Sequence, residues 1–260
     1  MNILVTNDDG VGAPGLLALV NSMKELGNVF VVAPDHNWSA SGHVKTLHRP
    51  LRAKPTELVD GTPALAVDGA PSDCVALAVL GLIVEPIHLV VSGINPNANL
   101  GHDVTYSGTV TAALEAAIWG LPGVAVSIDA PEGFTGALDF SAAAQVAQTV
   151  VRNVQEHGMP PHVILNVNVP YLPLDEIKGY HITRQGLRIY RDVLIKREDP
   201  RGKPYYWIGG DVPTGVREDD TDVGAMTDGY VSVTPIHLDL TAHQVIAELE
   251  EWKWGEGMNG

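Results

Sequence analysis

The sequence predicts an α/β protein: a mostly parallel sheet with helices on both faces, followed by a hairpin-rich C-terminal region and a terminal helix. From Met1 to about Ile128, short β-branched runs alternate with runs of helical periodicity, which is the pattern of βαβ units. The strand-like runs are apolar throughout, as expected when helices cover both faces of a sheet. With 260 residues, of which 45% are hydrophobic, the chain can bury one sizeable core.

The N-terminal elements follow in order from these patterns. A helix is also expected from Asp139 to His157, with Asp139 or Ser141 as its N-cap and Gly158 as its stop. The predicted strands are NILVT (2–6), NVFVVA (28–33), IHLVVS (87–92), GVAVSI (123–128) and HVILNVNVP (162–170), and the other helices are GLLALVNSMKEL (15–26) and TVTAALEAAIWG (109–120).

The pattern changes after about Pro173, where aromatic, β-branched and charged residues are interleaved. These segments suggest hairpins: GYHITRQG (179–186), LRIYRDVLIKRED (187–199), PYYWIGG (204–210) and GYVSVTPIH (229–237), with a terminal helix at TAHQVIAELEEWKW (241–254). We therefore divide the chain into an N-terminal α/β domain, 1–173, and a C-terminal region of hairpins and a helix, 174–260, in which we expect subunit contacts. The aromatic rings of the second region serve either hairpin packing or a subunit interface: Tyr190, Tyr205, Tyr206 and Trp207.

Charge and cysteine content restrict the partners. The formal net charge of −15 argues against nucleic-acid polymers and anionic membranes, since both need a basic face. The single cysteine, Cys74, excludes an internal disulfide and fits a reducing cytosol. The longest uncharged apolar run, 74–84, is shorter than the about 18 residues of a membrane span. No secretory signal is visible, so we expect a cytoplasmic protein.

The first predicted turn, NDDGVGAPG, admits two ligands. Gly10, Gly12 and Gly15 spell the dinucleotide fingerprint, and Asp35 ends the next strand, which would suit an NAD-dependent oxidoreductase. However, Asp8 and the neighbouring Asp9 stand in the same turn. Each close charge pair with a pyrophosphate would oppose binding by roughly 4 kcal/mol at an effective dielectric near 20. A divalent cation reverses that sign.

Three polar loops follow strands of the predicted sheet and offer oxygen ligands. They supply Asp8 and Asp9, then Ser39, then Asn95. Ligands converge beyond the carboxyl ends of parallel strands, and such oxygens select magnesium, manganese or calcium. Each loop also has a purely structural interpretation: the aspartates as turn or helix caps, and the asparagines of NPNAN as residues in left-handed turns.

A fourth segment, Tyr106 to Val110, leads into a predicted helix. Ser107, Gly108 and Thr109 supply hydroxyls and backbone N–H groups, which suit either an ordinary N-cap or a phosphate cradle. Beside a metal site we favour the cradle. The side chains of the second loop and its surroundings are expected to be solvated, although substrate contact is possible for them: His36, His43, His48, Lys45 and Arg49.

Long ordered motifs give the chain a resemblance to a known family. NILVTNDDG, APDHNWSASGH with TLHRPL, VSGINPNANLGHDVTYSGTVTAALE, DPRGKPYYWIGG and GYVSVTPIHLDLT together resemble the SurE family of stationary-phase survival proteins, from Met1 to about Thr241. The resemblance implies a Rossmann-like N-terminal domain, C-terminal association into dimers or tetramers, and metal-dependent hydrolysis of nucleoside 5′- or 3′-monophosphates. It implies one Mg²⁺ or Mn²⁺ on Asp8, Asp9, Ser39 and Asn95, with Ser107, Gly108 and Thr109 contacting phosphate.

Three positions depart from the family pattern without altering a proposed ligand: Ala70, Asn97 and Ala116. In the mechanism that follows, the metal polarises the phosphoryl group, water attacks in line, and Asp8 or Asp9 accepts the proton. Asp8, Asp9 and Asn95 then act in catalysis or substrate binding as well as in metal binding. Two other functions stay open: the oxidoreductase, and a non-catalytic nucleotide or metal sensor that uses the same pocket.

Overall fold

A nine-stranded sheet forms the centre of the computed structural model, which describes residues 1–131, 133–252 and 254. Its strand order is β3-β4-β2-β1-β5-β6-β7-β11-β8. These strands are β1 (Asn2–Thr6), β2 (Asn28–Pro34), β3 (Ala53–Glu57), β4 (Pro63–Val67), β5 (Leu89–Asn95), β6 (Gly123–Asp129), β7 (Val163–Pro170), β8 (Tyr180–Ile182) and β11 (Val231–His237). Only the β3–β4 and β7–β11 pairs are antiparallel, so the predicted mostly parallel sheet is confirmed.

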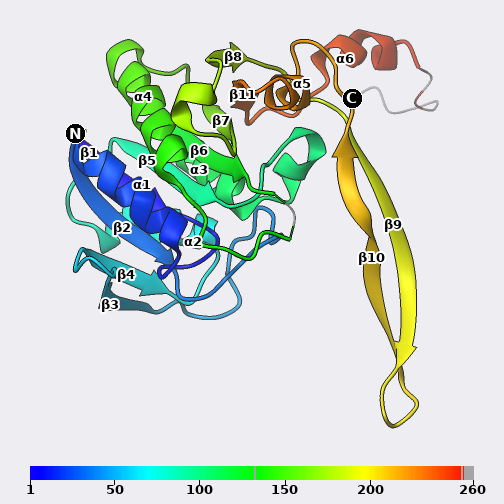
Figure 1. The fold of residues 1–260 in the computed structure, drawn as a ribbon, viewed down its shortest axis with the longest axis horizontal. Helices are drawn as coiled ribbons and strands as arrows, with labels where there is room; N and C mark the ends of the chain where they lie inside the picture. The colour runs from blue at the N-terminus through cyan, green and yellow to red at the C-terminus, as the bar shows by residue number, and fades with distance from the viewer. Residues whose placement is uncertain (132, 253, 255–260) are drawn as a thin grey trace.

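Helices cover both faces of the sheet, as the apolar strand runs predict. Helices α1 (Pro14–Lys24) and α4 (Ser141–His157) pack on one face, in front of the sheet in Figure 1, and α2 (Pro71–Leu77) and α3 (Gly108–Ile118) pack on the other. In β1, Ile3 and Val5 contribute to the first core, whereas Leu4 lies in the second. Burial on both faces therefore explains why residues 3–5 at the centre of this strand are all apolar.

The order of the strands fixes where a ligand can bind. β1 lies between β2 and β5, so the chain leaves the central strand in opposite directions along the sheet. The loops after these three parallel strands leave the same edge, and at such a switch in strand order they flank a crevice. The three oxygen-rich loops found in the sequence are these loops.

Two predicted hairpin segments join the main sheet instead. The expectation was wrong for GYHITRQG and GYVSVTPIH: β11 pairs antiparallel with β7, and the short β8 pairs parallel with β11. Burial explains the difference, because Val231 and Val233 of β11 complete the core next to β7. The alternation of apolar and polar residues does not identify the partner of either strand, and in β11 the polar Ser232 and Thr234 are buried as well.

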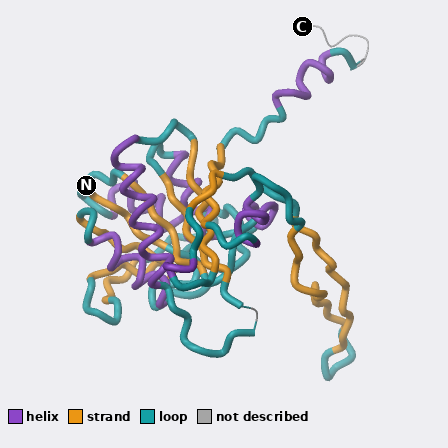
Figure 2. The backbone as a smooth tube through the Cα atoms, turned by 45° about the horizontal axis from the view of Figure 1, so that its top comes forward, coloured by secondary structure: helices purple, strands orange, loops and turns teal. Residues whose placement is uncertain are grey.

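The remaining hairpin is confirmed and extends away from the main body. β9 (Arg188–Glu198) pairs antiparallel with β10 (Pro204–Gly215), and the ribbon and tube views both show this pair projecting from the sheet (Figures 1 and 2). α5 (Asp222–Thr227) lies between the hairpin and β11 in the chain. α6 (His243–Glu250) is shorter than the predicted terminal helix, whose Lys253 lies outside the described residues.

The helix predicted from Asp139 is α4, and it begins two residues later. Its N-cap is Phe140, so the expected N-cap at Asp139 or Ser141 was wrong. Ser141 is the first residue of the helix, and its N–H donates to Asp139 Oδ1 over 2.8 Å. Gly158 follows the end of the helix with φ +72°. Among the residues that the structure describes, no helix has the length and apolar character needed to span a membrane.

Candidate active site

Two adjacent carboxylates follow the central strand. Asp8 is only 3% exposed, and Thr109 Oγ1 donates to its Oδ1 over 2.5 Å. Gly108 stands so close that an added Cβ would lie 2.7 Å from the Cβ of Asp8. The first turn of α3 therefore packs directly against the acid pair, which brings together the first and fourth segments singled out in the sequence.

The acid pair has no cationic partner within the described residues. No salt bridge there involves Asp8 or Asp9, and no cluster of three or more His, Cys, Asp or Glu side chains suited to a metal is found there. Burial raises the pKa of Asp8, against hydrogen bonds that include the one from Thr109. Burial, together with the charge of Asp8, raises the pKa of Asp9 to about 7. A bound cation would offset both effects.

Asp9→Asn is expected to raise the melting temperature of the metal-free protein at pH 8. The pKa of Asp9 rises from 3.8 to about 7 on folding, so its ionisation destabilises the folded state. That loss of stability develops as pH rises above the unfolded pKa and is complete above the folded one. Thermal melts at pH 8 and pH 4 with a chelator present should therefore show a difference that shrinks toward pH 4.

The matched control for this melt is Asp60→Asn. Hydrogen bonds from Thr62 and Lys24 lower the pKa of Asp60 to about 2, so removing this carboxylate should not raise the melting temperature. An Asp9→Asn protein that melts below the wild type at pH 8 without metal would contradict the account of the acid pair.

The backbone of the second loop is hydrogen-bonded to the backbone of the acid pair. The N–H of Trp38 donates to the carbonyl oxygen of Asp8 over 2.7 Å, and the N–H of Ser39 donates to Asn37 Oδ1 over 2.7 Å. The other end of the Asn37 amide lies 3.4 Å from Asp9 Oδ1. Ser39 is exposed, and it directly follows Trp38, the residue whose N–H binds the backbone of Asp8. Sequence reasoning missed Asn37, whose position two residues before Ser39 is typical of an Asx turn.

The third loop presents Asn95 at the end of β5. This residue is 8% exposed, and its Nδ2 donates to the carbonyl of Asn97 over 2.5 Å. Its Oδ1, the atom that can ligate a cation, accepts no hydrogen bond from any described residue. The left-handed interpretation of the NPNAN asparagines is wrong, since none of the three has a positive φ. Asn99 is instead buried and binds Asn168 and Ser127.

Ser107 and its neighbours begin α3 beside the acid pair. Ser107 is the N-cap, and its Oγ accepts from the N–H of Val110 over 3.1 Å. This confirms the N-cap interpretation, which does not exclude a ligand, because the first N–H groups of a helix lack intrahelical acceptors. Thr109 and Gly108 both touch Asp8, so the positive end of the helix lies next to the carboxylates.

Basic side chains of the second loop bind α3. Glu115, 2% exposed, accepts from His43 Nε2 at 2.9 Å and Lys45 Nζ at 3.1 Å, and also from Trp119. Burial opposes ionisation of Glu115, but these donors outweigh it and hold its pKa at about 2. His43 and Lys45 thus fasten the loop to α3, while both side chains stay partly exposed to solvent, as expected. His36 pairs with Asp35 at 2.6 Å.

A cavity of about 470 Å³ opens beside the acid pair. Its lining includes Asp9, the glycine turn, Asp35 and His36, together with the apolar Leu138 and Phe140. Gly15 contacts the end of β5: an added Cβ would lie 2.1 Å from the carbonyl oxygen of Ile94. Helix-to-strand packing therefore accounts for the third glycine of the apparent dinucleotide fingerprint.

Comparison with known proteins places this arrangement in a family. The model of the family described as "Survival protein SurE" matches residues 3–192. The "5'-nucleotidase SurE" of Chloroflexus aggregans is 51% identical, covering 98% of this chain and all of the relative, and that of Herpetosiphon aurantiacus is 50% identical, covering 98% and 99%. The crystal structure of the SurE protein from Aquifex aeolicus superposes with a TM-score of 0.80 at 41% identity, covering 96% of this chain and 98% of that one. The predicted resemblance is confirmed over nearly the whole length, and the chain belongs to the SurE family.

Proposed function

We propose that this protein is a metal-dependent phosphomonoesterase that hydrolyses nucleoside 5′- or 3′-monophosphates to nucleoside and phosphate. The observation that carries the proposal is the contact between the acid pair and the first turn of α3, through Thr109 and Gly108. It combines a site for a hard cation with a helix start suited to phosphate. Full-length relatives named 5'-nucleotidase support the same reaction.

The donor set fits a single Mg²⁺ or Mn²⁺. Asp8, Asp9, Ser39 and Asn95 would hold it, since they offer carboxylate, hydroxyl and amide oxygens from the loops after β1, β2 and β5. Such an ion, when bound, supplies Lewis-acid activation of the phosphoryl group and of water. The free Oδ1 of Asn95 and the deep burial of Asp8 are the features of this chain that match that role.

The protein's own groups then position and stabilise the ester. Asn95, Ser107, Gly108 and Thr109 bind the phosphate oxygens through the side-chain amide, the hydroxyls and the first backbone N–H groups of α3, where negative charge grows in the transition state. Asp8 or Asp9 accepts the proton of the attacking water. The cavity beside Asp9 gives room for the organic part of the ester.

Two other functions compete with this proposal. An oxidoreductase would bind the dinucleotide pyrophosphate at the glycine turn, where Asp8 and Asp9 repel it. A non-catalytic sensor would bind the same nucleotide and metal without turnover. Removal of metal by a chelator distinguishes the oxidoreductase from the phosphatase, since hydride transfer would survive it. Release of phosphate distinguishes the sensor, which would release none.

A colorimetric phosphate assay over nucleoside 5′- and 3′-monophosphates, with and without Mn²⁺ or Mg²⁺, tests the proposal. We expect phosphate release only with metal, its loss on adding EDTA, and its recovery on adding excess Mn²⁺. Nicotinamide-dependent absorbance change without phosphate release would favour the oxidoreductase. Nucleotide binding without release of phosphate from any substrate would favour the sensor.

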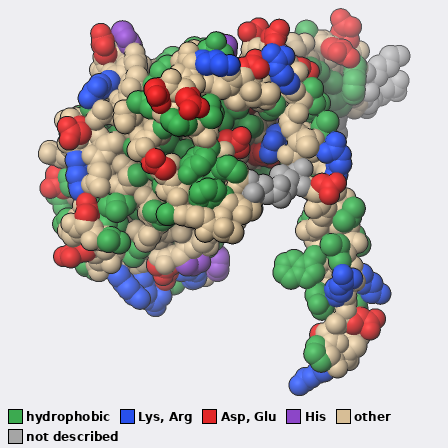
Figure 3. Space-filling model, in the orientation of Figure 1, with side chains coloured by type: hydrophobic (Ala, Val, Ile, Leu, Met, Phe, Trp, Pro, Cys, Tyr) green, Lys and Arg blue, Asp and Glu red, His purple; other side chains and the backbone are tan. Residues whose placement is uncertain are grey.

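We also propose a homodimer, or a homotetramer, in which residues 174–260 make the contacts and residues 1–173 carry the site. Apolar side chains lie exposed on the projecting hairpin (Figure 3), including Trp207 at 64%, Ile208 at 83% and Leu194 at 72%. An isolated two-stranded hairpin is marginal in water, and a second copy would bury these side chains. The free, buried Cys74 agrees with a cytoplasmic setting.

Light scattering checks this assembly. The wild type should have at least twice the mass of 27.7 kDa at micromolar concentration. The double substitution Trp207→Ser and Ile208→Ser should shift it toward the monomer, because it removes apolar area from the hairpin. Val59→Ser, which replaces a 92% exposed side chain between β3 and β4, should leave the mass unchanged. A wild-type mass near 27.7 kDa would refute the assembly but not the nucleotidase.

A further inference from the structure

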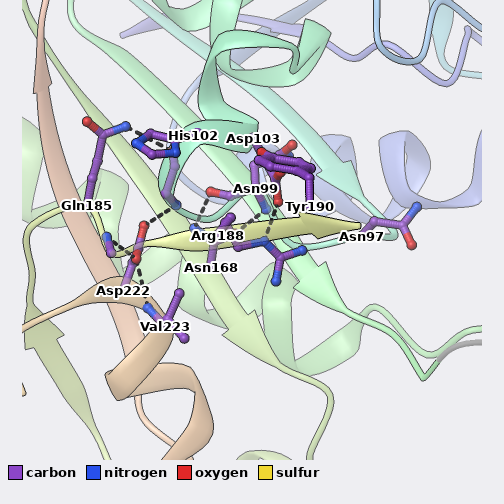
Figure 4. Close-up of polar contacts among 12 residues, drawn as sticks. Asn97, Asn99, His102, Asp103, Asn168, Gln185, Arg188, Tyr190, Asp222 and Val223 are labelled. Carbon is purple, nitrogen blue, oxygen red and sulfur yellow. Dashed lines mark hydrogen bonds and ion pairs between the residues drawn. The ribbon is translucent and has the colours of Figure 1, made fainter. Parts of the chain in front are cut away.

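The turn that precedes the phosphate-binding helix is fastened to the base of the projecting hairpin. This turn, η2 (Gly101–Thr105), lies between β5 and α3 in the chain. Figure 4 shows side chains of the segment from Gln185 to Tyr190, which leads into β9, directed at it. Two carboxylates join the two segments: Asp222 of α5 and Asp103 of η2 itself.

Asp222 makes the first junction. It is fully buried, and its two oxygens accept the N–H groups of Gly101 and Gly186, both over 2.7 Å. Gln185 Nε2 donates to the carbonyl of Gly101 over 3.0 Å, and a Cβ on Gly101 would lie 2.5 Å from the oxygen of Gly186. The start of η2 and the segment before β9 are therefore in direct contact.

Asp103 makes the second junction, and it also contacts Ser107 at the start of α3. Its carboxylate accepts from Arg188 Nε at 2.8 Å and from the hydroxyl of Tyr190 at 2.5 Å, and Arg188 and Asp103 are both less than one-fifth exposed. Its backbone carbonyl accepts the N–H groups of Tyr106 and Ser107 at 2.9 and 3.1 Å. One residue thus binds the base of β9 through its side chain and the N-cap of α3 through its main chain.

We propose that Asp103 is a positioning residue, through which Arg188 and Tyr190 set the geometry of phosphate binding by Ser107 and its neighbours. This inference rests on the proposed function of the Ser107 to Thr109 segment. Charge-assisted hydrogen bonds hold one geometry better than a solvated loop does. When the side-chain bonds are lost, the proposed metal ligands on the other loops stay in place, but Ser107 loses its fixed position.

The test compares Asp103→Ala, Tyr190→Phe, the double variant and the control Arg217→Gln. Arg217 makes a two-bond pair with Asp228 in the same C-terminal region and does not contact η2. Isothermal titration gives the Kd for inorganic phosphate on the Mn²⁺-loaded protein and the Kd for Mn²⁺ alone. Steady-state assays with a nucleoside monophosphate give kcat and KM separately.

We expect Asp103→Ala to weaken phosphate binding about tenfold and Tyr190→Phe about threefold, as for loss of hydrogen bonds to a charged group. Mn²⁺ binding should change by less than about twofold in both, while kcat/KM falls with phosphate affinity. The double variant should match Asp103→Ala alone, since both changes act through one carboxylate. Arg217→Gln should bind phosphate like the wild type.

Unchanged phosphate affinity in folded Tyr190→Phe and Asp103→Ala would overturn the inference. So would a double variant whose loss of affinity equals the product of the two single losses, or a control Arg217→Gln that weakens phosphate binding equally. If the wild type binds phosphate but hydrolyses no nucleotide, the proposed function fails, and the phosphate constants still decide the role of Asp103. A wild type that binds no phosphate would overturn both.

Discussion

Asp8→Asn is expected to lower kcat for nucleoside monophosphates by about 10²–10³-fold, the effect of losing one preorganised electrostatic group. Asp8 is almost fully buried, accepts a hydrogen bond from the hydroxyl of Thr109 and touches Gly108, so its charge lies directly against the start of α3. The amide of asparagine keeps the shape but removes the charge that a hard cation needs. Steady-state assays over a range of Mn²⁺ concentrations measure the loss.

The folded state should survive this change. The neutral amide removes a carboxylate whose pKa burial raises, so circular dichroism and thermal melts without metal should show no loss of structure. Asp60→Asn, which removes an exposed carboxylate that pairs with Lys24, controls for the change in net charge and should keep wild-type kcat. Near-normal turnover of Asp8→Asn at saturating Mn²⁺ would remove Asp8 from the metal site.

Gly108→Ala should have an effect of similar size, for a steric reason. Its Cβ would lie 2.7 Å from the Cβ of Asp8 and 3.0 Å from its Oδ2, so either the acid or the first turn of α3 must move. Displacement of about 1 Å at a reacting centre costs roughly 10² in rate. Both kcat and Mn²⁺ affinity should fall, because the residue displaced is a proposed ligand.

Gly12→Ala is the matched control, because an added Cβ at Gly12 meets no atom within 4 Å. A phosphatase should tolerate it, with turnover within about threefold of the wild type, since the added side chain is only one methyl group. In a dinucleotide site the second glycine lets the backbone approach the pyrophosphate, so the same change would be severe. Equal losses in the two variants would therefore weaken the steric account of Gly108.

The fold follows from the sequence wherever burial dictates the pattern. Residues 3–5 and 29–33 lie in the covered parts of β1 and β2, so they are all apolar and predict parallel strands. The positions of β8 and β11 do not follow, because an alternating pattern predicts a strand without identifying the strand that it pairs with. The pairing depends on the exposed edge of β7, which only the assembled sheet provides.

The site is predictable to the extent that topology brings strand ends together. Asp8, with Gly108 and Thr109 across the sheet edge, is such a case. The supporting contacts are harder to find, since Asn37, Glu115 and Asp103 act on loops that are distant in sequence. No local pattern indicates that Glu115, on a helical face, binds the His43 loop, or that Asp103 binds the base of β9.

Anomalous diffraction from crystals of the protein with Mn²⁺ and phosphate tests the central claim most directly. The account predicts one manganese peak per chain, bound by Asp8 and Asp9 together with Ser39 Oγ and Asn95 Oδ1 at about 2.0–2.2 Å, typical of small hard cations. It also predicts phosphate between the metal and the start of α3, in contact with Ser107 and Thr109. Manganese elsewhere on the chain, or phosphate at the glycine turn away from α3, would contradict it.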